Sequence, residues 1–165
     1  MENTKHDTSI TGIWKIMEEI YDPEIPVLSI VDLGIIRDIK LNDDEFEICI
    51  TPTYSGCPAM DVIAMNIRMQ LLKNDFKKLK ITQQLSPAWT TDWMTKSGKE
   101  KLRTYGITPP VGKSFDKKNL EELQVECPLC HSTNTKLISQ FGSTSCKALY
   151  QCNECKEPFD YFKCH

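Results

Sequence analysis

The chain lacks several features that define common protein classes. It contains no run of about 18 apolar residues that could span a membrane, and its first ten residues lack the basic and apolar segments of a secretory leader. It also has no Glu-x-x-His pair of the kind that holds a di-iron site and no Gly-x-Gly-x-x-Gly dinucleotide fingerprint. We therefore expect a cytoplasmic protein that is not itself an oxygenase or a dinucleotide-dependent enzyme.

Histidine and concentrated positive charge are also scarce. No histidine occurs between residues 7 and 130, which leaves Cys57 without the base that a cysteine hydrolase needs. The net charge is -3, divided into -8 over residues 1–60 and +5 over residues 61–165. The C-terminal excess is too diffuse to indicate nucleic acid. The separation could orient a protein partner, although a solvated surface explains it as well.

The cysteines are concentrated near the C-terminus, where six of the eight follow residue 126. Two Cys-x-x-Cys pairs stand 21 residues apart, and in a reducing compartment such pairs are more typical of metal sites than of disulfides. Each pair can form a knuckle, and the intervening length suits a strand, a turn and a strand. We predict a zinc ribbon over residues 127–165, with structural Zn(II) held by four thiolates: Cys127, Cys130, Cys152 and Cys155.

Two alternatives remain open for this region. A mononuclear iron site or a four-cysteine iron–sulfur cluster also accepts four thiolates. The spare soft ligands are Cys146, Cys164, His131 and His165. A buried thiol at Cys146 and solvated imidazoles are the simpler interpretations, but Cys146 or the Cys164-His165 pair could exchange into the site.

Hydrophobic periodicity predicts an α-β-β-α-β order before the ribbon. An amphipathic helix over 9–21, capped by Thr8 or Ser9, precedes strands at 35–41 and 46–50 that form an antiparallel hairpin. A helix over 58–74 then crosses to a third strand at 79–85, and a weaker helix runs from a cap at Thr90 or Thr91 to Gly106. The predicted class is α+β with a mixed sheet, divided into a domain at 8–106, a linker at 107–126 and the ribbon at 127–165.

The second helix carries two apolar stripes. One contains Met60, Ile63, Ala64, Ile67 and Leu71, and the other contains Val62, Met65, Met69 and Leu72. One stripe can face the sheet. The rest of the fold or a second protein chain could cover the other stripe, and a homodimer is one such arrangement.

Cys57 and two aspartates are the candidate functional residues of the first domain. Cys57 is predicted at the N-cap of the second helix, where free amides and the helix dipole lower the pKa of a thiol. It is either a reactive or metal-holding cysteine or a structural thiol in a tight turn. Cys49 is expected to be an ordinary strand residue. Asp22 and Asp32 are candidate carboxylates, but turns select aspartate at such positions too.

Short motifs along the chain then resemble known families. The first group covers roughly residues 10–85 and resembles the small domain of iron–sulfur cluster assembly proteins: Asp22-Pro-Glu-Ile-Pro-Val, Ile30-Val-Asp-Leu-Gly-Ile-Ile, Thr51-Pro-Thr and Gly56-Cys57-Pro58. A second group extends a resemblance over nearly the whole chain to the D subunits of phenylacetyl-CoA epoxidase (ring 1,2-monooxygenase) systems: Trp89-Thr-Thr-Asp-Trp93, Tyr105-Gly-Ile, Pro109-Pro110, Phe141-Gly-Ser-Thr, Cys146-Lys-Ala and Glu157-Pro-Phe-Asp-Tyr-Phe-Lys.

The resemblance implies a maturation factor of aerobic phenylacetate degradation. Its partners would be the other subunits of the epoxidase system, above all the iron–sulfur flavoprotein reductase, with no nucleic acid or membrane involved. Cys57 would be the ligand of a transient iron or iron–sulfur cluster, in surroundings shaped by Asp22, Asp32, Thr51 and Thr53. A structural subunit of the oxygenase complex is the alternative.

Overall fold

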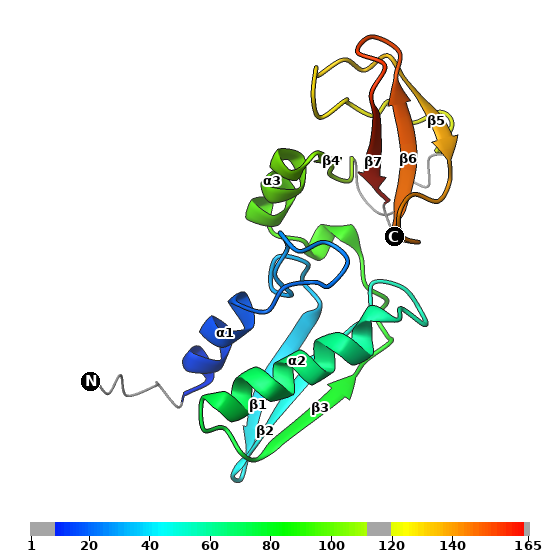
Figure 1. Ribbon diagram of the computed structural model, residues 1–165. Helices are drawn as coiled ribbons and strands as arrows, with labels where there is room; N and C mark the ends of the chain where they lie inside the picture. Colours follow the sequence, from blue (N-terminus) through cyan, green and yellow to red (C-terminus); the bar gives the residue numbers. More distant parts are fainter. Residues whose placement is uncertain (1–8, 112–119, 164–165) are drawn as a thin grey trace, which may run out of the picture. The chain divides into compact units, whose positions relative to one another are not determined.

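The computed structural model describes residues 9–111 and 120–163, and the chain divides into two compact units, Met1–Trp89 and Thr90–His165. Figure 1 labels their helices and strands. Among the described residues, no helix has both the length and the apolar composition needed to cross a membrane.

The first unit has the predicted α-β-β-α-β order and a mixed sheet. Its elements are α1 (Ile10–Glu18), β1 (Ile36–Asn42), β2 (Glu45–Ile50), α2 (Ala59–Lys73) and β3 (Leu79–Gln83). The strand order is β1-β2-β3, in which β1 and β2 are antiparallel and β2 and β3 are parallel. A parallel neighbour requires a crossover connection, and α2 supplies it. The predicted fold class is therefore confirmed for this unit.

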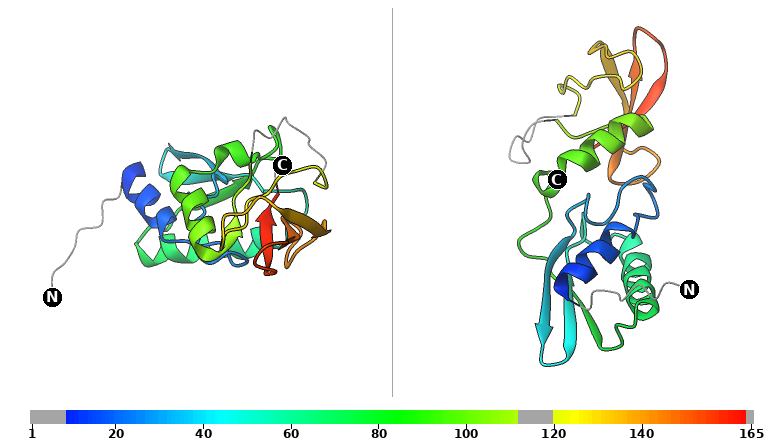
Figure 2. Two further views of the ribbon diagram at one scale, coloured as in Figure 1. Left: turned by 90° about the horizontal axis from the view of Figure 1, so that it is seen from above. Right: turned by 90° about the vertical axis from the view of Figure 1, so that its left-hand side faces the viewer.

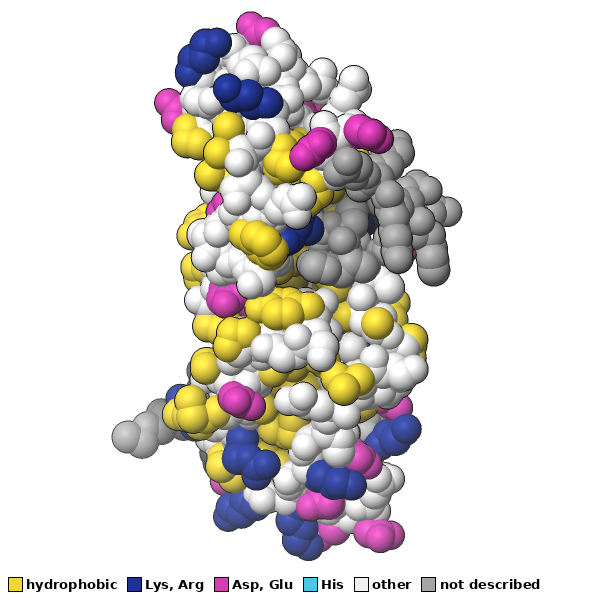
Figure 3. Space-filling model, turned by 90° about the vertical axis from the view of Figure 1, so that its right-hand side faces the viewer, with side chains coloured by type: hydrophobic (Ala, Val, Ile, Leu, Met, Phe, Trp, Pro, Cys, Tyr) yellow, Lys and Arg dark blue, Asp and Glu magenta, His cyan; other side chains and the backbone are white. Residues whose placement is uncertain are grey.

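One face of this sheet is buried and the other is exposed. Ile39, Ile48 and Ile50 are at most 5% exposed, and α1 and α2 lie over this face (Figures 1 and 2). The opposite face carries surface ion pairs, such as Lys40–Asp38 at 2.8 Å and Lys80–Glu47 at 3.3 Å. On the face of the molecule in Figure 3, basic side chains are intermingled with acidic ones and form no continuous patch.

One local hydrogen bond defines the start of α1, and another holds the end of the first unit against its interior. The Ser9 hydroxyl accepts a hydrogen bond from the Gly12 amide at 3.4 Å, so Ser9 is the cap. The Trp89 indole, which is 3% exposed, donates to the Leu33 carbonyl at 2.9 Å. This bond fastens the end of the unit to the loop that precedes β1.

The second unit contains a helix and a four-stranded sheet. Its elements are the 3-10 turn η1 (Thr91–Trp93), α3 (Lys96–Tyr105), β4 (Ile107–Thr108), β5 (Thr135–Ser139), β6 (Lys147–Cys152) and β7 (Pro158–Phe162). The strand order is β4-β7-β6-β5, with β4 and β7 parallel and the other pairs antiparallel. The strand, turn and strand between the cysteine pairs are β5 and β6, as predicted, whereas β4 and β7 were not predicted.

The predicted start of the weaker helix was wrong. Thr90 caps only η1, because Met94 then adopts an extended backbone (φ -66°, ψ 139°) that interrupts the helix. Thr95 caps α3 instead, accepting from the Gly98 amide at 2.9 Å. The predicted end is confirmed: Gly106 has φ +92°, a left-handed conformation that glycine adopts without a Cβ clash.

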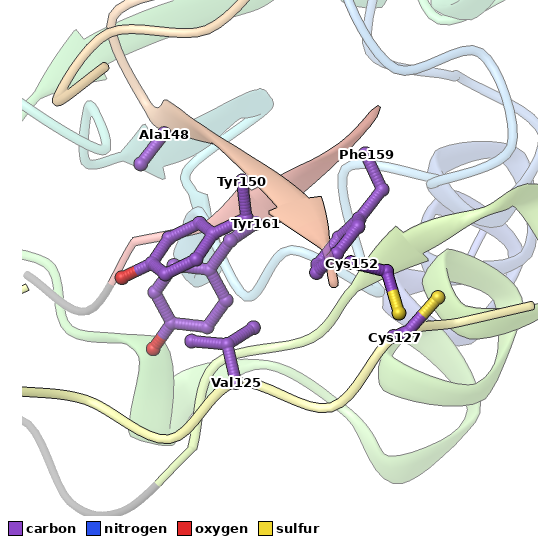
Figure 4. Close-up of a cluster of buried hydrophobic side chains, with 7 residues drawn as sticks. All are labelled: Val125, Cys127, Ala148, Tyr150, Cys152, Phe159 and Tyr161. Carbon is purple, nitrogen blue, oxygen red and sulfur yellow. The ribbon is translucent and has the colours of Figure 1, made fainter. Parts of the chain in front are cut away.

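The ribbon has a hydrophobic core of its own, shown in Figure 4. Its buried members are Val125, Cys127, Ala148, Tyr150, Cys152, Phe159 and Tyr161. Tyr150 stacks on Phe159 at a centroid distance of 6.0 Å and meets Tyr161 edge-on at 5.7 Å. Two candidate metal ligands, Cys127 and Cys152, are therefore part of this core and face each other beside the aromatic rings.

The stretch predicted as a linker contains ordered structure. Ile107 and Thr108 form β4, and the Thr108 hydroxyl donates to the Glu126 carbonyl at 2.7 Å. A turn occupies residues 120–122, where a short turn was expected. The predicted division into a domain at 8–106, a linker at 107–126 and a ribbon at 127–165 is a statement about which segments fold independently. It stays a prediction.

Candidate functional site

The four ribbon cysteines converge on one point. Their Sγ atoms all lie within 4.8 Å of one another, although the two pairs are far apart in sequence. Cys127 and Cys130 belong to the turn before β5, whereas Cys152 ends β6 and Cys155 lies in the turn before β7. Cys127 and Cys152 are fully buried, and Cys130 and Cys155 lie toward the surface.

The sulfur spacing fits a single tetrahedral ion. Zinc–sulfur bonds of about 2.3 Å at tetrahedral angles separate two sulfurs by about 3.8 Å. The observed distances are 3.7 Å between Cys127 and Cys155 and 3.5 Å between Cys130 and Cys152. An iron–sulfur cluster would spread its thiolates over two or more irons. The compact set of four sulfurs therefore favours a mononuclear site.

Backbone amides prepare this site for negative charge. Burial raises the pKa of Cys152, but the amides of Cys155 and Glu154 and the Cys130 and Cys155 thiols outweigh it and lower that pKa to about 7. For Cys155, the Glu157 amide lowers the pKa, but burial and the neighbouring sulfurs outweigh it and raise that pKa to about 12. A cation bound among the sulfurs would lower the pKa of Cys155 and so favour its thiolate.

A polar clip joins the two knuckles. Asn134, which follows the first pair, accepts hydrogen bonds from Asn153 in the second knuckle: one from its backbone amide and one from its side chain, both at 2.9 Å. The Asn134 side chain also donates to Glu154 at 2.8 Å. These bonds hold the knuckles at a fixed separation independently of the sulfurs. Turn-forming asparagines beside each pair were the only sequence signal for this clip.

The spare soft ligands have other surroundings. His131 Nδ1 lies 2.8 Å from a Glu126 carboxylate oxygen. Cys146 is 5% exposed and its sulfur lies 3.0 Å from the Thr144 hydroxyl, and it is not part of the four-sulfur cluster. Cys164 and His165 lie outside the described residues.

A second polar cluster lies under the loop between β5 and β6. Lys147, which is 4% exposed, approaches Asp160 at 3.5 Å, and the Ser143 hydroxyl donates to the same carboxylate at 2.9 Å. Gly142 passes so close that a Cβ there would lie 2.4 Å from an Asp160 oxygen. A side chain at position 142 would therefore have to displace the Asp160 carboxylate. In the sequence, the only sign of this cluster was the Phe141-Gly-Ser-Thr motif, which belongs to the family resemblance.

Cys57 lies in the loop that leads into α2. Its side chain is half-buried, and its amide donates to the Tyr54 carbonyl at 3.2 Å. α2 begins at Ala59, so the cap position falls on Pro58, one residue after the predicted Cys57. Pro58 has the helical dihedrals expected of it and makes no side-chain cap bond. Gly56, at φ +79°, makes the sharp bend that precedes Cys57. Cys49, by contrast, lies on β2 and contacts Gln84 at 3.4 Å.

The two candidate aspartates make hydrogen bonds within their own loops. Asp22 accepts from the amides of Glu24 and Ile25, both at 2.8 Å. Asp32 is 6% exposed and accepts from the Ser29 hydroxyl at 3.0 Å, while Ser29 accepts from the Asp32 amide at 3.0 Å. These are the bonds of turn-forming aspartates. A site-shaping role for either residue stays a prediction.

Thr51 carries a buried hydroxyl beside the Cys57 loop. Its amide donates to the Ile35 carbonyl at 2.8 Å, which ties the start of the loop to the segment after Asp32. Its Oγ1 atom has no hydrogen-bond partner within residues 9–111 and 120–163. Thr53 is half-buried. An unpaired buried hydroxyl costs about 1–3 kcal/mol, so its retention in this loop calls for an explanation.

Two family models match the chain. One, described as an iron–sulfur cluster assembly protein, matches residues 11–75 and includes Cys57. The other, described as the PaaD zinc beta ribbon domain, matches residues 112–163 and includes all four ribbon cysteines.

Among curated proteins, the chain is 52% identical over 152 residues to an Escherichia coli (strain K12) protein named as the D subunit of a "Putative 1,2-phenylacetyl-CoA epoxidase". That match covers 92% of this chain and 91% of the relative. The chain is also 34% identical over 92 residues to a Porphyromonas gingivalis protein named "Fe-S protein maturation auxiliary factor", covering 54% of this chain and 87% of the relative.

A solved structure supports the fold of the first unit. A domain of unknown function (DUF59) from Bacillus anthracis aligns with a TM-score of 0.52 at 24% identity. The alignment covers 56% of this chain and 89% of the Bacillus anthracis chain. At this identity the likeness concerns the fold alone.

Proposed function

The chain belongs to the family of 1,2-phenylacetyl-CoA epoxidase D subunits, and we propose that it is a cytoplasmic accessory protein of phenylacetate degradation that assists iron–sulfur cluster assembly. The acceptor of the cluster in this proposal is the iron–sulfur flavoprotein reductase of the epoxidase system. The match of the assembly model to residues 11–75 carries the proposal, and the relative named as a maturation factor supports it.

Cys57 is the residue that we assign to the cargo. It is half-buried in a loop, so its sulfur can meet a bulky ligand, and it precedes a helix whose first amides favour negative charge. The cluster here is cargo, bound through the Cys57 thiolate. Delivery is a ligand exchange: a client cysteine thiol displaces Cys57 from iron, the proton of that thiol passes to the released Cys57 sulfur, and no oxidation state changes.

We assign structural Zn(II) to the four ribbon cysteines. The support is the sulfur spacing, the four-thiolate donor set and the burial of Cys127 and Cys152 in the ribbon core. When bound, the metal supplies folding free energy to a small domain and a fixed geometry for both knuckles. In this proposal the ribbon is a docking module and does not itself carry the cluster.

Replacing the Cys57 sulfur tests the maturation role. In cells that carry Cys57→Ser, the reductase should accumulate at normal levels but contain less iron and sulfide per chain than in wild-type cells. Cys49→Ser is the matched control, because Cys49 is a half-buried strand residue of the same unit. Full cluster occupancy of the reductase in the Cys57→Ser cells would contradict the proposal.

A structural subunit of the oxygenase complex is the second candidate function. The exposed apolar side chains on α2, which are suited to a partner protein, favour it. This role predicts stable stoichiometric co-purification with the oxygenase subunits and no effect of Cys57→Ser on reductase clusters.

A further inference from the structure

A stripe of exposed apolar side chains runs along α2, opposite the face that packs on the sheet. Val62 is 39% exposed, Met65 54%, Met69 48% and Leu72 47%. On the other side of the helix, Met60, Ile63, Ile67 and Leu71 are at most 4% exposed. From the sequence, the rest of the fold or a second protein chain could cover this second stripe. In the described part of the chain these four side chains remain open to solvent.

The spacing of the stripe is that of a helix seam. Positions 62, 65, 69 and 72 follow one another by three, four and three residues, the a and d pattern of a heptad. At 3.6 residues per turn they span an arc of about 80° and a length of about 15 Å. A narrow, straight ridge of this kind packs against another helix, whose side chains fit between successive knobs.

Charges beside the stripe distinguish a foreign helix from a second copy. Arg68 flanks one side and Lys73 the other, both are exposed, and neither forms an ion pair with a residue in 9–111 or 120–163. Antiparallel pairing of two copies about the middle of the stripe would bring Arg68 close to Arg68 of the other copy. Like charges at such flanking positions oppose association.

The size of the stripe also argues against a permanent dimer. Four half-exposed side chains present a few hundred Å² of apolar surface. A stable interface buries about 800 Å² on each partner. The stripe therefore suits a transient helix, and its two methionines are flexible enough to pack against clients of different sequence.

We propose that the stripe on α2 is the docking site for an amphipathic helix of a partner protein, with apolar residues in three-four spacing and carboxylates opposite Arg68 and Lys73. The inference rests on the proposed function, because the partner is the protein that receives the cluster or one of its companion subunits. The stripe and Cys57 belong to the same helix and its entry loop. Docking there would present the client near the start of α2.

Site-specific photocrosslinking identifies the occupant. The full-length protein, with a photoreactive amino acid at position 65, is mixed with the purified reductase and oxygenase subunits, and the crosslinked peptide is sequenced. We expect a helical peptide of a partner subunit with heptad-spaced apolar residues and at least two carboxylates. Crosslinks to a second copy, to a non-helical segment or to no partner would each overturn the proposal.

Binding measurements with the same subunits provide the energetic test. Met65→Glu with Met69→Glu should weaken binding at least tenfold, and Arg68→Glu with Lys73→Glu about tenfold, whereas Met65→Leu with Met69→Leu should stay within about threefold. Leu41→Glu, at a 51% exposed position on β1, is the remote control. Affinity unchanged by both glutamate pairs, or equally reduced by the control, overturns the docking site. Such a failure leaves the maturation proposal standing if Cys57→Ser still lowers reductase cluster content.

Discussion

Asn134 and Asn153 are joined by two hydrogen bonds of 2.9 Å, one to a backbone carbonyl and one to a side-chain oxygen. They connect the two halves of the four-cysteine site through groups that are not metal ligands. Together with the Asn134–Glu154 bond, they fix the distance between the knuckles before any ion is bound. In metal sites generally, hydrogen bonds around the ligating side chains orient those side chains and change the affinity for the metal.

Asn134→Ala should therefore weaken zinc binding without removing a ligand. The substitution removes two side-chain bonds beside the cysteine pairs, and because neither bond reaches a ligand we expect a loss near the lower end of the ~10–100-fold range known for direct partners of ligands. Competition with a chromophoric chelator measures it. Asn42→Ala, at an exposed position whose side chain bonds Glu47 in the other unit, is the control. An affinity equal to that of the wild type would show that the side-chain bonds of the clip do not contribute to zinc binding.

Gly142→Ala should destabilise the second unit. The new Cβ would lie 2.4 Å from Asp160 Oδ1 and would displace the carboxylate from both Ser143 and Lys147. The buried lysine then loses its counter-charge. We expect a loss of about 2–3 kcal/mol in the free energy of unfolding, below the value for a fully buried pair, since the Asp160 side chain is 21% exposed. Denaturant titration measures it, and the exposed Ser145→Ala is the control. Equal stability of the two variants would contradict this account.

Burial makes Tyr150 a pH-dependent element of the ribbon core. Burial raises the pKa of Tyr150 from 10.0 to about 12, and its hydroxyl donates to the Leu120 carbonyl at 2.6 Å. The unfolded chain loses this proton at lower pH than the folded chain. The stabilisation is therefore complete below pH 10 and declines as the pH rises from 10 to about 12.

Tyr150→Phe isolates this effect from the other groups that titrate in the same range. Between pH 10 and 12 the stability of the wild type should fall more steeply than that of Tyr150→Phe, as measured by denaturant midpoints at each pH. Parallel curves for the two proteins would mean that burial does not hold the phenol protonated.

Thr51→Val tests whether the unpaired hydroxyl serves function. Removing a buried hydroxyl that lacks a partner among the described residues should stabilise the first unit by about 1–3 kcal/mol. If the hydroxyl contributes to the Cys57 site, the same change lowers cluster content of the reductase. Thr53→Val, at a half-buried neighbour, should change stability little. A destabilised Thr51→Val protein would show that the hydroxyl is satisfied.

The elements of this chain follow from its sequence to different degrees. Helix and strand periodicity was sufficient for α1, α2 and the β1–β2 pair, because each has one buried face and clear turn residues at its ends. The start of α3 could not be predicted, since Thr90, Thr91 and Thr95 are all plausible caps and the extended backbone at Met94 decides between them. The short strand β4 was missed because two residues carry no periodicity.

Some features of the candidate site could likewise be predicted from the sequence and others could not. Paired cysteines at fixed spacing predicted a cluster of sulfurs that the structure brings together. The Asn134 clip and the Lys147–Asp160 pair depend on contacts between residues 13 or more positions apart, which no local pattern encodes. The role proposed for Cys57 came from motif resemblance, because a half-buried thiol in a turn is chemically ambiguous.

Metal and sulfide content after oxygen-free purification shows whether Cys57 carries a cluster. The wild-type protein, Cys57→Ser and Cys49→Ser are purified from iron-replete cells, and zinc, iron and sulfide are measured per chain. We predict about one zinc in all three proteins, with iron and sulfide in the wild type and in Cys49→Ser but not in Cys57→Ser. Equal iron and sulfide in all three, or none in the wild type, would contradict a cluster carried by Cys57.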